Sequence, residues 1–193
     1  MGRPKQFDPD VALDRAMRTF WSKGYAGTTP QDLVDELGIG KGSLYNTFGG
    51  KHDLFLAALR RYADSAARQF TELMEEPGPV RQRVRRIFDA TVDPAPLPNA
   101  GQDGCLAVNT AAELATVDEQ AAEIVRKMFA RTERELREVL ERARRDGEIS
   151  PDRDPRILAA HLFATLVGLR VLMKTTTDPA SLRPIVDAAI AAL

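Results

Sequence analysis

The residues best suited to contact a polyanion lie in one short segment, from Lys41 to Lys51. Lysine and hydroxyl side chains can bind phosphate oxygens, and an asparagine such as Asn46 can pair with adenine through two hydrogen bonds. Gly42 and Ser43 are small, which suits the start of a helix that enters a DNA major groove about 12 Å wide. The segment therefore favours contact with duplex DNA.

The residue types that catalysis or metal binding would need are scarce. The chain has one cysteine and two histidines, which excludes an intrachain disulfide framework and a zinc cluster. It contains no nucleophile–base motif, no phosphate-cradling glycine loop and no paired acidic motif. We expect no catalytic residue, no cofactor and no metal; an enzyme with an unrecognised site in the C-terminal part is the weaker alternative.

The charge balance limits how the chain can bind DNA. It has 27 Lys and Arg against 28 Asp and Glu, a net charge of -1, and residues 1–62 contain nine basic and seven acidic residues. A nucleoid-type protein that binds without sequence preference depends on phosphate neutralisation, so this balance disfavours that alternative function. Tight binding to DNA would instead need two copies of the chain, bound to half-sites whose centres lie about 34–36 Å apart on the DNA.

The basic and polar segment is predicted to lie on the second helix of a helix-turn-helix at residues 29–48. Thr29 is the predicted N-cap of the first helix, and Asp32 completes a capping box. Gly38 to Gly40 forms a tight turn, and Leu44 faces the core.

Two runs of sequence resemble the DNA-binding domain of TetR/AcrR-type transcriptional repressors. The run from Phe20 to Thr29 contains G-Y-x-x-T-T, and the run from Leu37 to Lys51 contains G-x-L-Y-x-x-F-x-x-K. Thr47 stands where the family usually has His, and Gly40 where it usually has Ser. The resemblance implies a repressor released from a palindromic double-stranded DNA operator by a small-molecule or electrophile/oxidant signal.

The resemblance also implies roles for individual residues. Thr29 would bind a phosphate, although a capping role explains it as well, and the Tyr45 ring could be a half-buried core aromatic. Phosphates would be contacted by Lys41, Tyr45 and Lys51. Bases would be contacted by Ser43 and Asn46, and Thr47 lies beside them. Arg3 and Lys5 would contact DNA from an N-terminal arm.

Apolar residues recur every three or four positions along the chain, which predicts an all-α protein of about nine helices. We assign an N-terminal three-helix DNA-binding domain to residues 6–66 and a larger effector-binding and dimerisation domain to residues 67–193. A long helix is shared between them. The expected helices cover residues 9–23, 30–37, 41–48, 51–76, 80–92, 105–116, 118–145, 154–174 and 179–192.

The last two helices carry a candidate dimer surface. Ala160, Ala164 and Gly168 are spaced by four, so two helix backbones could approach closely, and Ile185 and Ala189 extend the surface. TetR-like proteins pair their last two helices as a four-helix bundle, so the resemblance implies a homodimer. Packing within one chain is the alternative for these residues.

Residues 67–193 would also hold the effector. Asn109 and Glu113, four apart, give one helix a polar face that suits either a pocket or helix–helix hydrogen bonding. Other candidates for the pocket wall, which plain core packing explains equally, are Phe88, Val92, Met128, Phe129 and His161.

Cys105 is the only thiol, and it follows Gly104 where a helix is predicted to begin. Unpaired amides at a helix N-terminus favour a reactive thiolate. Two interpretations stay open: a sensor of electrophiles or oxidants, and a small buried hydrophobe.

No segment approaches the roughly 18 continuous apolar residues of a membrane span. The longest apolar stretch, near residues 158–173, is interrupted by His161, Thr165 and Arg170, and the N-terminus lacks the apolar region of a signal peptide. We expect no membrane partner, and a cytoplasmic protein that is nucleoid-associated when bound to DNA.

Overall fold

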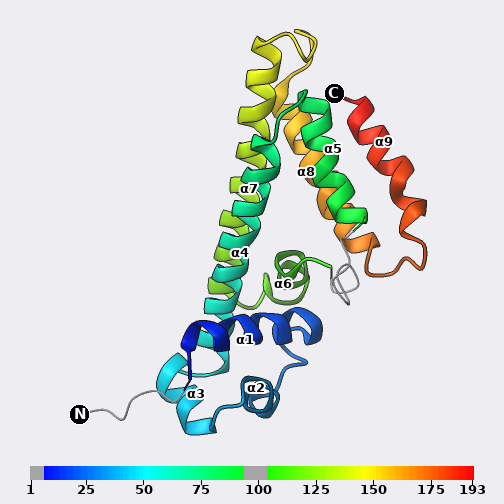
Figure 1. Cartoon of the computed structure of the whole chain (residues 1–193). Helices are drawn as coiled ribbons and strands as arrows, with labels where there is room; N and C mark the ends of the chain where they lie inside the picture. Colours follow the sequence, from blue (N-terminus) through cyan, green and yellow to red (C-terminus); the bar gives the residue numbers. More distant parts are fainter. Residues whose placement is uncertain (1–6, 94–103) are drawn as a thin grey trace.

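The computed structural model describes residues 7–93 and 104–193, and within these ranges it contains nine α-helices, one short 3-10 helix and no strand. This confirms the all-α prediction. Figure 1 shows a small head below a tall helical bundle. The head consists of α1 (Pro9–Lys23), α2 (Pro30–Leu37) and α3 (Lys41–Phe48). The other helices are α4 (Lys51–Glu75), α5 (Val80–Val92), α6 (Leu106–Leu114), α7 (Glu119–Arg145), α8 (Pro155–Leu172), η1 (Pro179–Leu182) and α9 (Arg183–Ala191).

The helix ends follow local chemistry that the sequence already displays. The Asp8 carboxylate caps α1, and Gly24 ends it at a positive φ of 74°. The capping box predicted for Thr29 and Asp32 is present at the start of α2. The expected last helix divides into η1 and α9 instead, because Pro184 lacks the N–H that a continuous helix would use.

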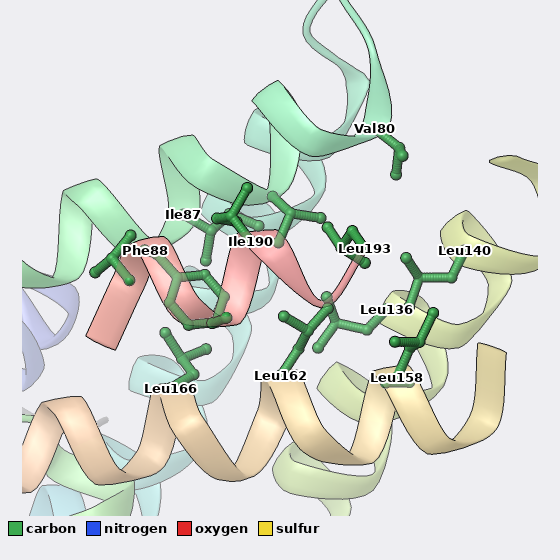
Figure 2. Close-up of a cluster of buried hydrophobic side chains, with 14 of the residues drawn as sticks. Val80, Ile87, Phe88, Leu136, Leu140, Leu158, Leu162, Leu166, Ile190 and Leu193 are labelled. Carbon is green, nitrogen blue, oxygen red and sulfur yellow. The ribbon is translucent and has the colours of Figure 1, made fainter. Parts of the chain in front are cut away.

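The buried side chains form two hydrophobic clusters, one above the other. The lower cluster joins the head to α6 and to the first half of α7. The upper cluster joins α5, α8 and α9 to the second half of α7, as Figure 2 shows. Helix α4 enters both clusters, with Leu54 to Tyr62 in the lower and Phe70 and Met74 in the upper. The shared role expected of this helix is therefore confirmed.

Charged side chains add a second connection between α1 and α4. The Arg61 guanidinium donates two hydrogen bonds to the Asp14 carboxylate, at 2.6 and 2.9 Å, and a third to Asp10 at 3.0 Å. Bidentate Arg–carboxylate pairs are strongly directional. Helix α1 therefore keeps a fixed position on the base of α4.

By length and composition alone, helix α8 is long and apolar enough to cross a membrane, with a mean hydropathy of 1.4. This differs from the expectation that no segment approaches a membrane span. However, Leu158, Leu162, Leu166 and Leu169 pack in the upper cluster. A helix that lies in the core of a bundle has the same composition. We interpret α8 as a core helix.

Candidate nucleic-acid interface

The helix-turn-helix is held by a small apolar core beneath its turn. Leu33, Leu37, Ile39 and Leu44 are buried, so α2 and α3 are packed against each other on their inner sides. Gly38 ends α2 in the left-handed region, with φ 66° and ψ 32°, a conformation that glycine adopts without steric cost. The turn therefore sets the direction in which α3 leaves the head.

The outer side of α3 presents polar groups to solvent. Lys41, Ser43 and Asn46 are exposed, and among the described residues no side-chain hydrogen bond or ion pair engages them. Tyr45 is 43% exposed rather than buried in the core. Thr47 is only partly exposed. The residues predicted to contact phosphates and bases are thus brought onto one short, accessible helix.

Two further predicted contacts already have partners within the chain. The Thr29 hydroxyl donates to the Asp32 carboxylate at 2.6 Å and accepts from the Asp32 N–H at 3.1 Å. The Lys51 ammonium lies 4.2 Å from the centre of the Tyr25 ring, a cation–π contact. Arg3 and Lys5 lie outside the described residues. The DNA contacts of all four residues stay predictions.

The start of α2 carries a strongly stabilised negative charge. The hydrogen bond from Lys23, at 2.7 Å, lowers the pKa of the Asp32 carboxyl far below its ordinary value, and hydrogen bonds from Thr29 lower it further. A carboxylate at a helix N-terminus also interacts favourably with the helix dipole. The first turn of α2 is therefore fixed to the end of α1.

Cys105 occupies the N-cap position of α6, where the sequence predicts a helix to begin, and is only 2% exposed. Its Sγ accepts a hydrogen bond from the Tyr62 hydroxyl at 3.2 Å and one from the Arg170 guanidinium at 3.4 Å. Burial, and next the adjacent Cys105, raise the pKa of Tyr62 well above its ordinary value. The Tyr62 hydroxyl therefore stays protonated and can donate a hydrogen bond to the sulfur.

An open groove of about 600 Å³ lies between α4 and α7. Of the predicted pocket residues, Met128 lines this groove. Ala63, Ala67 and Ile124 supply further apolar surface, while charged side chains such as Arg60 lie along it. The volume falls within the range of sites for small ligands.

Three of the predicted pocket residues lie elsewhere. Phe88 and Val92 are 1% and 2% exposed in the upper cluster, and Figure 2 shows the Phe88 ring directed toward Leu166, so they are core residues. His161 is exposed on α8. Phe88 and Val92 thus follow the core-packing alternative, because an apolar helix face has the same sequence pattern whether it lines a cavity or packs against another helix.

The remaining pocket candidates make specific contacts within the chain. Phe129 packs edge-on against Phe163, with ring centres 5.4 Å apart. Asn109 accepts a hydrogen bond from Lys174 at 3.0 Å. The Glu113 carboxylate accepts the backbone N–H groups of Tyr25 and Ala26, at 3.0 and 2.7 Å. Glu113 therefore makes a contact within the chain, from α6 to the turn after α1.

The predicted dimer residues separate into two groups. Ala160 and Ala164 are exposed on α8, Gly168 is partly exposed beside them, and Ile185 is 37% exposed on α9. Ala189 is 2% exposed and packs in the upper cluster, which corresponds to the alternative of packing within one chain.

A contact that the sequence did not predict joins His52 to Asp118. The Nε2 of His52 lies 2.8 Å from the Asp118 carboxylate, and the His52 side chain is 40% exposed. The two residues are 66 positions apart. No periodicity or short motif carries such a pairing, so only the folded chain reveals it.

Comparisons with known proteins agree with this geometry. Residues 12–58 match the family described as bacterial regulatory proteins, tetR family, and residues 81–189 match the tetracyclin repressor-like C-terminal domain. The uncharacterised HTH-type transcriptional regulator YezE of Bacillus subtilis is 34% identical over all of both chains. The HTH-type transcriptional repressor ComR of Escherichia coli is 34% identical over 88% of this chain and 81% of its own.

One similar protein has been solved together with DNA. The TetR family transcriptional regulator CifR, as a mutant of its cysteines, was solved with 26-bp double-strand operator DNA; it is 30% identical with a TM-score of 0.86 over 99% of both chains. TetR proteins are dimeric DNA-binding regulators rather than enzymes, and they act in the cytoplasm. The chain therefore belongs to the TetR family of transcriptional regulators, with double-stranded DNA and a second copy of itself as partners.

Proposed function

We propose that this regulator is a repressor that binds a palindromic operator, and that an electrophile or oxidant releases it by reacting at Cys105. Ser43 and Asn46 of α3 read base edges, while Lys41 and Tyr45 hold phosphates. The exposed polar side of α3 supports this division of roles, since short polar groups face outward beside longer ones. The bound protein is then associated with the nucleoid.

The observation that carries the proposed signal is the set of groups around the sulfur. The Cys105 Sγ lies at the N-terminus of α6, and it accepts hydrogen bonds from a neutral hydroxyl and from a guanidinium cation. Cations, donors and helix N-termini are the surroundings in which a cysteine sulfur becomes a nucleophile. A cysteine that serves only as a small hydrophobe has no need of a charged donor.

The chemical step is an addition. The sulfur forms a bond to an electron-poor carbon of a quinone, and the thiol proton passes to the quinone, which becomes a hydroquinone adduct. The added group does not fit where Cys105 is 2% exposed between Tyr62 and Arg170. Overfilling a packed core forces the surrounding backbone to move. The start of α6 is the nearest backbone that can shift.

The test measures binding of the purified dimer to its own upstream intergenic DNA before and after treatment with benzoquinone. Because the chain has one cysteine, any thiol adduct is at Cys105. We expect treatment to lower the operator affinity of the wild type and to leave that of Cys105→Ser unchanged. An equal response of both proteins, or no response of either, would refute the proposed signal.

The groove between α4 and α7 supports a second candidate, a non-covalent effector. Its apolar surface includes Met128 and Ile124, and its volume of about 600 Å³ would hold a small ligand. A metabolite that weakens operator binding equally in the wild type and in Cys105→Ser, but not in Met128→Glu, would assign the signal to the groove.

A further inference from the structure

The connection between α6 and α7 contacts the DNA-binding head on both sides of its helix-turn-helix. On one side, the Glu113 carboxylate accepts the N–H groups of Tyr25 and Ala26, which lie just before α2. On the other, Asp118 pairs with His52, the second residue of α4, just after α3. We call Glu113, Asp118 and their three partners the clasp.

The contact at Glu113 is specific to a carboxylate at this position. Its two oxygens each take one backbone N–H, and these amides belong to the turn after α1, where no helix partner serves them. A Cβ at Gly24 would lie 3.1 Å from a Glu113 oxygen, so the turn and the side chain are closely fitted. Hydrogen bonds to a charged acceptor are stronger than neutral ones.

Helix α6 is attached to α1 at its other end as well. The Trp21 indole N–H donates to the carbonyl of Gly104 at 3.2 Å, next to Cys105. Buried residues of α6, among them Leu106 and Leu114, share the lower cluster with Phe20 of α1. Figure 1 shows α6 lying directly above α1. A shift of α6 therefore cannot occur without a change at the turn that leads into α2.

We infer that Glu113 and Asp118 are positioning residues for operator recognition, which fix the orientation of the helix-turn-helix on the bundle. The Arg61 hydrogen bonds, the Trp21–Gly104 hydrogen bond and the lower cluster also hold α1 on the bundle, and the clasp adds the attachments that lie nearest to α2 and α3. In a dimer, the orientation of each head sets the separation of the two α3 helices. That separation must match half-sites one DNA turn apart.

The inference rests on the proposed reading role of α3 but not on Cys105. It also assigns a path for the proposed signal, because α6 carries the thiol at its N-terminus and the clasp begins with Glu113 near its C-terminus. From the head, the backbone amides of Tyr25 and Ala26 bond Glu113, and the His52 imidazole pairs with Asp118. The Tyr25 phenol also lies near both carboxylates, and burial, then Asp118 and Glu113, raise its pKa.

The experiment tests three clasp variants, which are Glu113→Gln, His52→Ala and the two changes combined. Glu135→Gln is the control. His52→Ala removes the second attachment but leaves Asp118 free to cap α7, where it accepts the Ala121 N–H. Glu135 is a matched control, since it is a helical glutamate whose partner, Arg131, lies on its own helix. The DNA probe is a palindromic duplex selected by the wild-type protein from a random library, with versions in which one base pair is inserted or deleted between the half-sites.

We expect each clasp variant to bind the selected duplex about tenfold more weakly, within the usual range of coupling between sites. We also expect it to discriminate less between the selected spacing and the two altered spacings. Affinity for unrelated DNA and the melting temperature should match those of the control. A merely structural role would instead lower the melting temperature and all DNA binding together.

The inference is overturned if the clasp variants keep the wild-type spacing preference, or if their loss of affinity extends equally to unrelated DNA. These measurements use no thiol reagent, so they stand even if quinone has no effect on the wild type. Failure of the wild type to select any palindromic duplex would instead refute the proposed reading by α3.

Discussion

Helices α3 and α8 are built alike on their inner sides and differently on their outer sides. Each buries leucines, Leu44 in α3 and Leu162, Leu166 and Leu169 in α8. The outer side of α3 carries Lys41, Ser43 and Asn46, whereas that of α8 carries mostly small and apolar residues beside Arg156 and His161. The exposed large apolar residues of α8 are Ile157, Val171 and Leu172, at 69%, 49% and 42%.

The difference teaches how one fold presents two kinds of partner. Exposed polar side chains that have no partner within residues 7–93 and 104–193 suit the phosphates and base edges of DNA. A long exposed apolar side is unfavourable in water and marks a surface that another protein covers. The outer surface of α3 therefore suits DNA, and that of α8 suits the second copy of the chain.

The largest expected effect comes from breaking the α8 surface with Gly168→Leu. Apart from its chain neighbours and the backbone of its own helix, a Cβ at Gly168 meets no described atom within 4 Å, so the protomer can accommodate leucine, which also favours a helix. In the dimer it would force two closely approaching helices apart. We expect sedimentation to show monomers and operator affinity to fall on the order of 100-fold, because the two heads can no longer bind simultaneously.

Glu72→Leu is the matched control, since it places a leucine on an exposed position of α4 instead. It should remain dimeric and retain its operator affinity. A dimeric Gly168→Leu protein with wild-type affinity would show that α8 faces solvent in the functional assembly.

An intermediate effect is expected from changing the α3 surface with Asn46→Ala. Removing a bidentate base contact costs about 1–3 kcal/mol and should relax the preference at one position in each half-site. Selection from a random DNA library, followed by sequencing, measures this directly.

Lys41→Ala sharpens the same comparison, because it removes a phosphate contact and no base contact. Its affinity should fall similarly for all sequences, and the slope of log affinity against log salt should decrease by about 1 for each phosphate that is no longer neutralised. If Asn46→Ala retains the wild-type base preference at every position, Asn46 is not a base reader.

The smallest expected effect concerns the start of α2. Lys23 and Thr29 hold the pKa of Asp32 below its unfolded value of about 3.9, so the stability that it contributes is present above that pH and is lost as the pH falls below it. Asp32→Asn should therefore reduce the loss of melting temperature between about pH 5 and pH 3, shifting the acid midpoint by less than about 0.5 pH unit.

Asp35→Asn is the control on the same helix, since Asp35 lies outside the capping box and accepts a hydrogen bond from the Gln31 side chain. It should leave the acid profile of the wild type unchanged. An Asp32→Asn profile identical to that of the wild type would show that the capping box does not contribute to acid stability.

Local features were predictable because their causes lie within a few residues. Short-range rules explain the caps at Asp8 and Thr29, the start of α6 at Cys105, the glycines that end α1 and α2, and the exposed positions of α3. The all-α class follows from the apolar period in the same way. The family was also predictable from the sequence, because the motifs that resemble TetR/AcrR-type repressors lie between Phe20 and Lys51.

Three-dimensional packing alone decided which apolar faces meet each other and which meet solvent. Phe88 and Ala189 have the same pattern as pocket or interface residues, yet both lie in the upper cluster. The clasp pairs Glu113 and Asp118 with residues 66 to 88 positions away. The sequence determines the helices and their polar sides because these depend on neighbours in the chain, whereas contacts between distant segments depend on how the whole set of helices fills the core.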